Sequence, residues 1–213
     1  MGKYEFTGET KDVHGTRFRQ IKALKDFRHV KKGDIGGWLE SESNLKQSGD
    51  AWVHGNAQVY GNARVSCNAL VYGDAWVSCD ARVSGNAQVY GNARVSGNAQ
   101  VYGNAQVYGD AQVYGDARVS GDARVSCNAR IYGDALVSGN AWGKSPLYIQ
   151  GTKYQLTTSS HTAITIGCQT MTPDEWLGVK GLESAKEEGF TDDEIDEYRD
   201  YIELAKKYLA KFI

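Results

Sequence analysis

The sequence predicts a mainly β chain, folded as a solenoid with a β cap at one end and two α-helices at the other. Residues 53–142 repeat one six-residue pattern fifteen times without an insertion: aliphatic, Tyr/Ser/His, Gly/Cys, Asn/Asp, Ala and a variable residue. A fixed short period is typical of stacked units that bury apolar side chains only against the units above and below them. Beyond the repeat, Thr172–Glu175 and Thr191–Glu194 have the capping-box pattern that begins helices.

Two positions of each hexad are apolar, and they define the core of the predicted solenoid. The first position is Val except at Ile131, and the fifth is always Ala, from Ala57 to Ala141. A period of six predicts strands of about three residues separated by corners rather than long alternating strands. The Gly-Asn and Gly-Asp pairs mark these corners, because Gly, Asn and Asp tolerate the positive φ angles of a sharp bend.

Four segments follow from the pattern. Residues 1–52 are expected to form an N-terminal cap, with a β-hairpin that turns at His14-Gly15 and an irregular first coil. Residues 53–142 form the repeat, residues 143–171 supply closing strands, and residues 172–213 are helical. In the helical segment, one helix is predicted from Pro173 to Gly189 and a second after Thr191.

Composition excludes several classes of function. The 213 residues carry a formal net charge of −2, which provides no strong field for nucleic acid or a membrane surface. The sequence has no secretory signal and no apolar run of membrane-spanning length. Cys67, Cys79 and Cys127 are not expected to stack on one another and Cys168 stands alone, so neither a disulfide nor a metal cluster is expected. A cytoplasmic protein is the prediction.

The repeat resembles the hexapeptide-repeat proteins over all of residues 53–142. This resemblance implies a left-handed parallel β-helix of triangular section, with three hexads per turn and residues eighteen apart stacked on one face. Trimers of parallel rods are common among such proteins, which makes a homo-oligomer, with a trimer favoured, the expected assembly.

One face of the predicted prism carries a ladder of Tyr72, Tyr90 and Tyr108, continued by Trp142 stacked above Arg124. Aromatic enrichment favours an interface, either with sister chains in an oligomer or with the C-terminal helices, while the alternative is that stacked rings only cover the sheet. The last helix has a heptad seam that includes Ile195, Ile202, Leu209 and Phe212. This seam is predicted either to join sister chains or to pack on the chain's own rod.

A second face is a candidate for binding an anion. Arg64, Arg82 and Arg118 fall in one column, with Tyr102 and several hydroxyls beside it. The guanidinium group donates a rigid fork to phosphate or carboxylate, so a small anionic ligand, such as a nucleotide, is conceivable. The alternative is that Asp and Asn side chains at neighbouring corners pair with these arginines and leave an ordinary solvated surface. Asp80, Asp116 and Asp122 are among these corner residues.

The resemblance also brings in acyl transfer from coenzyme A, because many hexapeptide-repeat proteins are acyltransferases. In those enzymes a His acts as the general base that removes a proton from the acceptor, and a loop that extends from one coil closes over the donor. Here His54 is the one His of the repeat, His161 lies beyond it, and fifteen unbroken hexads leave no room for the loop. A zinc site needs three imidazoles, so no metal and no cofactor are expected.

The non-repeat segments resemble hexapeptide-repeat proteins of phages and prophages, which are often labelled transferases from their fold alone. The resemblance rests on Lys32–Trp38, Thr165–Cys168 and Glu175-Trp176. It favours a non-catalytic, phage-encoded protein that binds a host protein or a small anionic ligand, with a role against host defence as a hypothesis. A CoA-dependent acyltransferase that uses His54 or His161 is the first alternative, and a purely structural spacer is the second.

Overall fold

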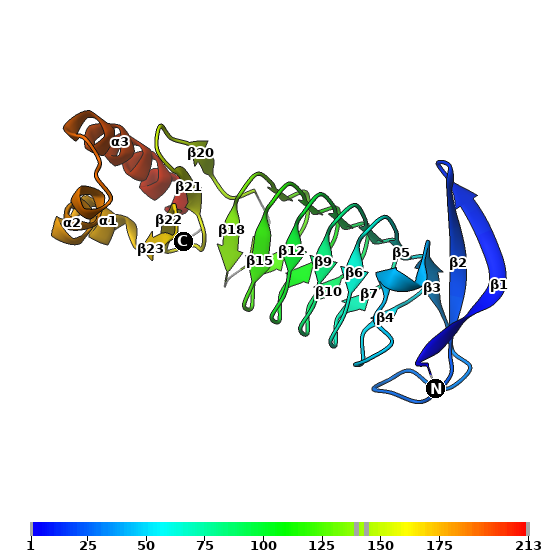
Figure 1. The fold of residues 1–213 in the computed structure, drawn as a ribbon. Coiled ribbons are helices and arrows are strands. Elements are labelled where there is room, and N and C mark those ends of the chain that lie inside the picture. Colours follow the sequence, from blue (N-terminus) through cyan, green and yellow to red (C-terminus); the bar gives the residue numbers. More distant parts are fainter. Residues whose placement is uncertain (1, 139–140, 143–144, 212–213) are drawn as a thin grey trace.

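The computed structural model describes residues 2–138, 141–142 and 145–211, and it is a rod of stacked triangular coils with a different cap at each end (Figure 1). About six turns form a parallel β-solenoid, as the period of the sequence predicts. Each turn contributes one short strand to each of three parallel sheets. Phe212 of the predicted seam lies outside the described residues.

The three faces of the solenoid are named here by what they carry. The hairpin face consists of β3 (Ile35–Leu39), β5 (Gln58–Val59), β8 (Trp76–Val77), β11 (Arg94–Val95), β14 (Gln112–Val113) and β17 (Arg130–Ile131). The tyrosine face consists of β4 (Trp52–Val53), β7 (Leu70–Val71), β10 (Gln88–Val89), β13 (Gln106–Val107), β16 (Arg124–Val125) and β19 (Ala141–Trp142). The arginine face consists of β6 (Arg64–Val65), β9 (Arg82–Val83), β12 (Gln100–Val101), β15 (Arg118–Ser120) and β18 (Leu136–Ser138).

The interior of the solenoid is a column of aliphatic side chains. Every first-position residue from Val53 to Ile131 and every Ala from Ala57 to Ala129 is fully buried. Because strand pairing joins residues eighteen apart, as Val89 with Val107, each side chain packs against its own counterparts one turn away. Backbone N–H groups donate to the next turn, for example Tyr90 N to Val107 O at 2.9 Å, so the backbone is satisfied between turns.

The corners require left-handed backbone. Gly97 has a φ of +67°, and a Cβ added there would lie 2.8 Å from the nitrogen of Gly115 on the next turn. Cys67, Cys79 and Cys127 nevertheless take the same conformation, with φ of 60°, 58° and 55°. The close stacking of corners, together with the positive φ, explains why Gly predominates at this position.

The first turn comes from residues before the regular repeat. Leu39 pairs with Val59, Leu45 forms a bridge with Val65, and Val53 pairs with Val71. Paired residues are therefore twenty positions apart up to Leu45 and eighteen apart from Val53 onward. This change accommodates the spacing of eight residues between Leu45 and Val53, where the regular repeat has six. The short 3-10 helix η1 (Glu42–Asn44) lies in this turn, and Asn44 Nδ2 donates to the carbonyl oxygens of Gly61 and Ala63 at 2.9 and 3.0 Å.

The N-terminal hairpin of β1 (Tyr4–Val13) and β2 (Thr16–Ala23) extends the hairpin face beyond the first turn. Its side chains close the open end of the core, where Tyr4 and Phe27 pack edge-on against the buried Trp52. Lys3 is also fully buried there, and its Nζ donates to Ala51 O at 2.7 Å. Burial lowers the pKa of Lys3 to about 8, against a partial opposing effect of Asp50.

The other end is closed by an antiparallel sheet and three helices, called here the C-terminal unit (residues 145–211). The sheet contains β20 (Tyr148–Gln150), β21 (Gln155–Thr158), β22 (Ile164–Ile166) and β23 (Gln169–Met171). The helices are α1 (Pro173–Leu177), α2 (Val179–Glu187) and α3 (Asp192–Leu209). A separate core joins α3 to the sheet, with Ile202 packed among Leu156, Ile164 and Trp176.

Two local expectations are corrected at this end. The single helix predicted from Pro173 to Gly189 is broken at Gly178, whose backbone is extended. The break allows α1 and α2 to cross closely at Gly181. Only glycine fits there, because an added Cβ would lie 2.0 Å from the Trp176 carbonyl oxygen. The backbone register pairs Trp142 with Val125 and Ala141 with Arg124, so Trp142 is not above Arg124. The last strand is therefore shifted by one residue relative to the repeat.

Candidate functional site

The arginine face brings together the residues predicted to bind an anion. Arg64 pairs directly with Arg82, and Gln100 stands between Arg82 and Arg118 in the same column. All three arginines are exposed. Strand spacing places Arg64 and Arg82 roughly 5 Å apart at the backbone, and Arg82 and Arg118 roughly 10 Å apart.

The corner carboxylates do not neutralise this column. Asp80, Asp116 and Asp122 instead accept hydrogen bonds from asparagines one turn below; Asn98 Nδ2, for example, donates to Asp116 Oδ1 at 2.9 Å. Within the described ranges, none of the three arginines has a carboxylate within 4 Å. The described structure therefore lacks ion pairs between the corner carboxylates and these three arginines, which are exposed to solvent.

Tyr102 lies on the same face, directly after β12. The residue is 38% exposed, and its neighbours in the column are Ser84 and Ser120. No other ring of the described chain contacts the Tyr102 ring, so it is not stacked. The face thus combines a cationic column with an unstacked aromatic ring.

A shallow hollow lies at the N-terminal end of the arginine column. Arg64 lines it together with Lys46, Glu42, Ser43 and Ser48. Lys46 belongs to the irregular first turn, where its N–H donates to Val65 O at 3.0 Å. The sequence did not indicate that Lys46 belongs to this surface. Leu45 pairs with Val65, twenty rather than eighteen residues later, which places Lys46 below Ser66. The only sign of this change in the sequence is the spacing of eight residues between Leu45 and Val53.

The tyrosine face carries the expected ladder. Tyr72, Tyr90 and Tyr108 are stacked with ring centroids 4.7 and 4.9 Å apart and planes within 2°. The Tyr72 hydroxyl donates to Gln88 Oε1 at 3.2 Å. Burial raises the pKa of Tyr72 and Tyr90. The rings are half-buried against each other, and association of copies through this face stays a prediction.

The seam on the last helix packs within its own chain. Ile202 and Leu209 are each 3% exposed in the core of the C-terminal unit, and Ile195 is half-buried beside a cavity there. In this structure the seam therefore packs at the end of the chain's own rod, which is one of the two alternatives predicted for it. Ile202 and Leu209 are not available to a sister chain in this conformation, because their own sheet covers them.

The two histidines proposed for catalysis lie at opposite ends of the rod. His54 follows β4 in the first turn, and His161 lies in the turn between β21 and β22 (Figure 1). Trp52 packs edge-on against the His54 ring at 6.0 Å, and burial lowers the pKa of His54 although Asp34 opposes the shift. One protomer cannot bring both imidazoles to a single reaction centre.

The described part of the chain has no group of three His, Cys, Asp or Glu side chains arranged to hold a metal ion. No helix in that part is long and apolar enough to span a bilayer. Cys67, Cys79, Cys127 and Cys168 are all free and exposed.

The uninterrupted coil and its flat faces define the repeat block as a β-solenoid of the hexapeptide-repeat type. Five stretches match the family described as YdcK Beta solenoid repeat; they are residues 57–73, 87–103, 99–115, 111–126 and 129–142. A protein of Escherichia coli (strain K12), named "Uncharacterized acetyltransferase YdcK", is 39% identical over 51 residues. This match covers 24% of the present chain and only 15% of the length of that protein.

Proposed function

We propose that this chain is a non-catalytic binding protein whose arginine face holds a small anionic ligand that carries an aromatic ring, as a nucleotide does. The observation that carries the proposal is the free column of Arg64, Arg82 and Arg118 beside the unstacked ring of Tyr102. Phosphate groups fit the forked donors of arginine, and a base fits the open face of a tyrosine.

Titration with ADP, followed by calorimetry and by NMR, tests this proposal. Replacing Arg82 and Arg118 together by Gln is expected to weaken ADP binding by tenfold or more, because two charge-assisted contacts are lost. Arg124→Gln is the matched control, since Arg124 is equally exposed but lies on the tyrosine face. Tyr102→Ser should weaken ADP binding but leave binding of inorganic pyrophosphate unchanged. Equal losses in the control variant, or no ADP binding at all, would refute the site.

The origin and the setting of the protein belong to the same proposal. The resemblance to phage hexapeptide-repeat proteins makes a component of a host bacterium the natural source of the ligand, with a role against host defence. Four free, exposed cysteines suit a reducing compartment, so we place the protein in the cytoplasm. Copies are proposed to associate through the tyrosine face, with a trimer favoured.

A CoA-dependent acyltransferase is the second candidate, because the matched Escherichia coli protein is named an acetyltransferase. Binding alone cannot decide between the candidates, since coenzyme A contains an adenine nucleotide. Acetyl transfer from acetyl-CoA to amine or hydroxyl acceptors is the deciding measurement. Turnover abolished by His54→Asn or His161→Asn, in a variant that remains folded, would favour the enzyme over the binding protein.

A further inference from the structure

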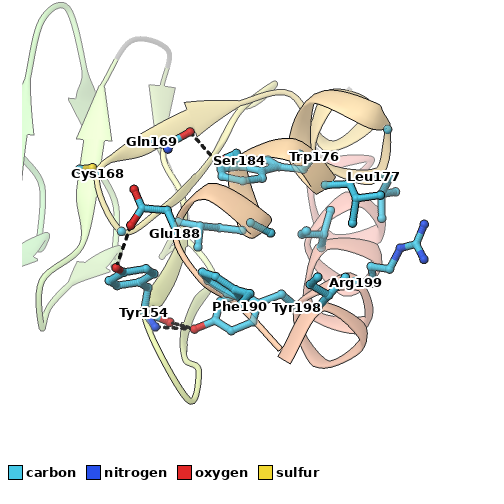
Figure 2. A pocket seen from close by; sticks show the side chains of 18 of the residues that line it. Tyr154, Cys168, Gln169, Trp176, Leu177, Ser184, Glu188, Phe190, Tyr198 and Arg199 are labelled. Atoms are coloured by element: carbon cyan, nitrogen blue, oxygen red, sulfur yellow. Dashed lines mark hydrogen bonds between the residues drawn. The ribbon is translucent and has the colours of Figure 1, made fainter. Parts of the chain in front are cut away.

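The C-terminal unit contains a cavity, partly open to solvent, that the proposed function does not use. It has a volume of about 300 Å³ and lies between the sheet β20–β23 and the three helices (Figure 2). This volume is at the lower end of the range of small-molecule pockets, roughly 300–1,000 Å³. The site is independent of the arginine face, because every residue that lines it comes from the segment between Tyr154 and Ile202.

The apolar walls of the cavity are held in place by contacts of their own. Trp176 Nε1 donates to Ile164 O at 2.9 Å, which fixes the indole against the sheet. The Tyr198 hydroxyl donates to the backbone carbonyl of Tyr154, and Phe190 packs edge-on against Tyr198 at 5.1 Å. The aromatic side chains are thus positioned without a ligand, which is typical of a pre-formed pocket.

Polar groups gather on one side of the cavity. Figure 2 shows Cys168, Gln169 and Glu188 toward β22 and β23, whereas Leu177 lies on the opposite side. Ser184 Oγ donates to Gln169 Oε1 at 2.8 Å. The Tyr154 hydroxyl donates to one carboxylate oxygen of Glu188 at 3.1 Å, and the other oxygen has no hydrogen-bond partner in the described chain.

The charge on the polar side is negative. Arg199 also lines the cavity, but Figure 2 shows its guanidinium group pointing away from the other side chains. Lys153 does not line the cavity; its ammonium group binds the carbonyl oxygens of Glu188 and Gly189 at 2.7 and 2.8 Å. A ligand in the cavity would therefore meet the Glu188 carboxylate as its charged partner.

We propose that this cavity binds a small molecule with an aromatic body and an amine at one end, with the ammonium group paired to Glu188. The rings of Trp176, Phe190 and Tyr198 would cover the apolar body. An ammonium group in this position gains a charge-assisted hydrogen bond, whereas a carboxylate in the same position would face a like charge.

Three compounds test the proposal on the 213-residue chain: 4-phenylbutylamine, 4-phenylbutanol and 4-phenylbutyrate. They share a phenyl ring and a four-carbon chain, and they differ in the polar group at the end of that chain. Binding is measured by calorimetry, and the site by mapping thiol labelling at Cys168. Cys67, Cys79 and Cys127 serve as references in the same chain, because they are exposed on the solenoid. The amine is expected to bind about tenfold more tightly than the carboxylate and to slow labelling of Cys168 alone.

Two variants locate the charge that sets this preference. Glu188→Gln should remove the preference for the amine over the alcohol, whereas Glu187→Gln should retain it, because Glu187 is exposed like Glu188 but does not line the cavity. Both variants change one surface charge and keep the apolar core. A carboxylate that binds as well as the amine overturns the proposal, and so does a folded protein in which no compound protects Cys168 at millimolar concentration.

Discussion

The solenoid and the C-terminal unit differ in how their apolar cores are packed. In the repeat of the solenoid, nearly every core residue is Val or Ala, and it pairs with its counterpart one turn away, as Val89 does with Val107. In the C-terminal unit, side chains of different shapes pack around Trp176 and Ile202, and an interior space remains. Repetition therefore distributes a site over a flat face, whereas the irregular packing creates a recessed one.

The two regions also differ in how polar groups are satisfied. Asparagines and aspartates at the corners bond to residues eighteen positions away, as in the series Asn68, Asn86, Asn104 and Asp122. The C-terminal unit relies on single contacts such as the Trp176 indole with Ile164 and the capping box of Thr191 with Glu194. Single substitutions should therefore cause small, local losses of stability in the solenoid. In the C-terminal unit, large losses of stability should be confined to a few residues.

The largest effect is expected from Trp176→Ala. Losing a buried indole and its hydrogen bond should destabilise the C-terminal unit by about 3–5 kcal/mol. Hydrogen exchange should then become faster across β21–β23 and α3, while amides of the solenoid between Val59 and Val125 keep their protection. Leu204→Ala, an exposed position of α3, is the control. Equal loss of protection in both regions would show that they unfold as one unit.

The next effect concerns the buried Lys3 and depends on pH. The folded pKa of about 8 lies below the ordinary 10.5, so the unfolded chain binds more protons between these values. Stability should therefore rise with pH through this window, by about 3 kcal/mol from this group. Tyr4 acts in the opposite direction at higher pH, because burial raises its pKa from 10.0 to about 12.

Urea unfolding between pH 7 and 12 measures both effects. In Lys3→Met the rise above pH 8 should disappear, whereas the fall above pH 10 should remain, since Tyr4 is unchanged. A variant whose pH profile matches that of the parent would exclude Lys3 as the source of the rise.

A smaller effect distinguishes two corners of the solenoid. Gly97→Ala should cost more than the roughly 1–2 kcal/mol of a positive φ alone, because it adds a contact of 2.8 Å with the next turn to that strain. At Gly55 the nearest atom to an added Cβ is 3.7 Å away, so Gly55→Ala should cost only the strain. Thermal unfolding of the two variants checks this order, and a larger loss at Gly55 would contradict it.

The smallest effect tests whether the hydrogen bonds between corner side chains contribute additively to the free energy of unfolding. Asn86→Ala removes two ladder hydrogen bonds, one received from Asn68 and one donated to Asn104, whereas Asn56→Ala removes one. These groups are exposed, so losses of about 1 and 0.5 kcal/mol are expected. Urea unfolding measures the two values, and equal losses would argue against an additive ladder.

The regular part of the molecule could be predicted because its spacing is uniform. The pairing of Arg64 with Arg82 and the stacking of Tyr72 on Tyr90 both follow from an eighteen-residue turn. The prediction failed where that spacing changes, at Trp142, which a one-residue shift places opposite Val125. It also missed the break at Gly178, because a capping box specifies where a helix begins but not where it crosses its neighbour.

The amino-acid pattern alone determined the solenoid, its three faces and the residues on each, because every turn has the same length and the same two inward positions. Only the tertiary structure decided which charges remain free on the arginine face, since asparagine or arginine could each have bonded the corner carboxylates. It also decided that the last helix packs on its own sheet and leaves a cavity. Contacts between segments far apart in the chain have no period, so no spacing in the sequence could specify them.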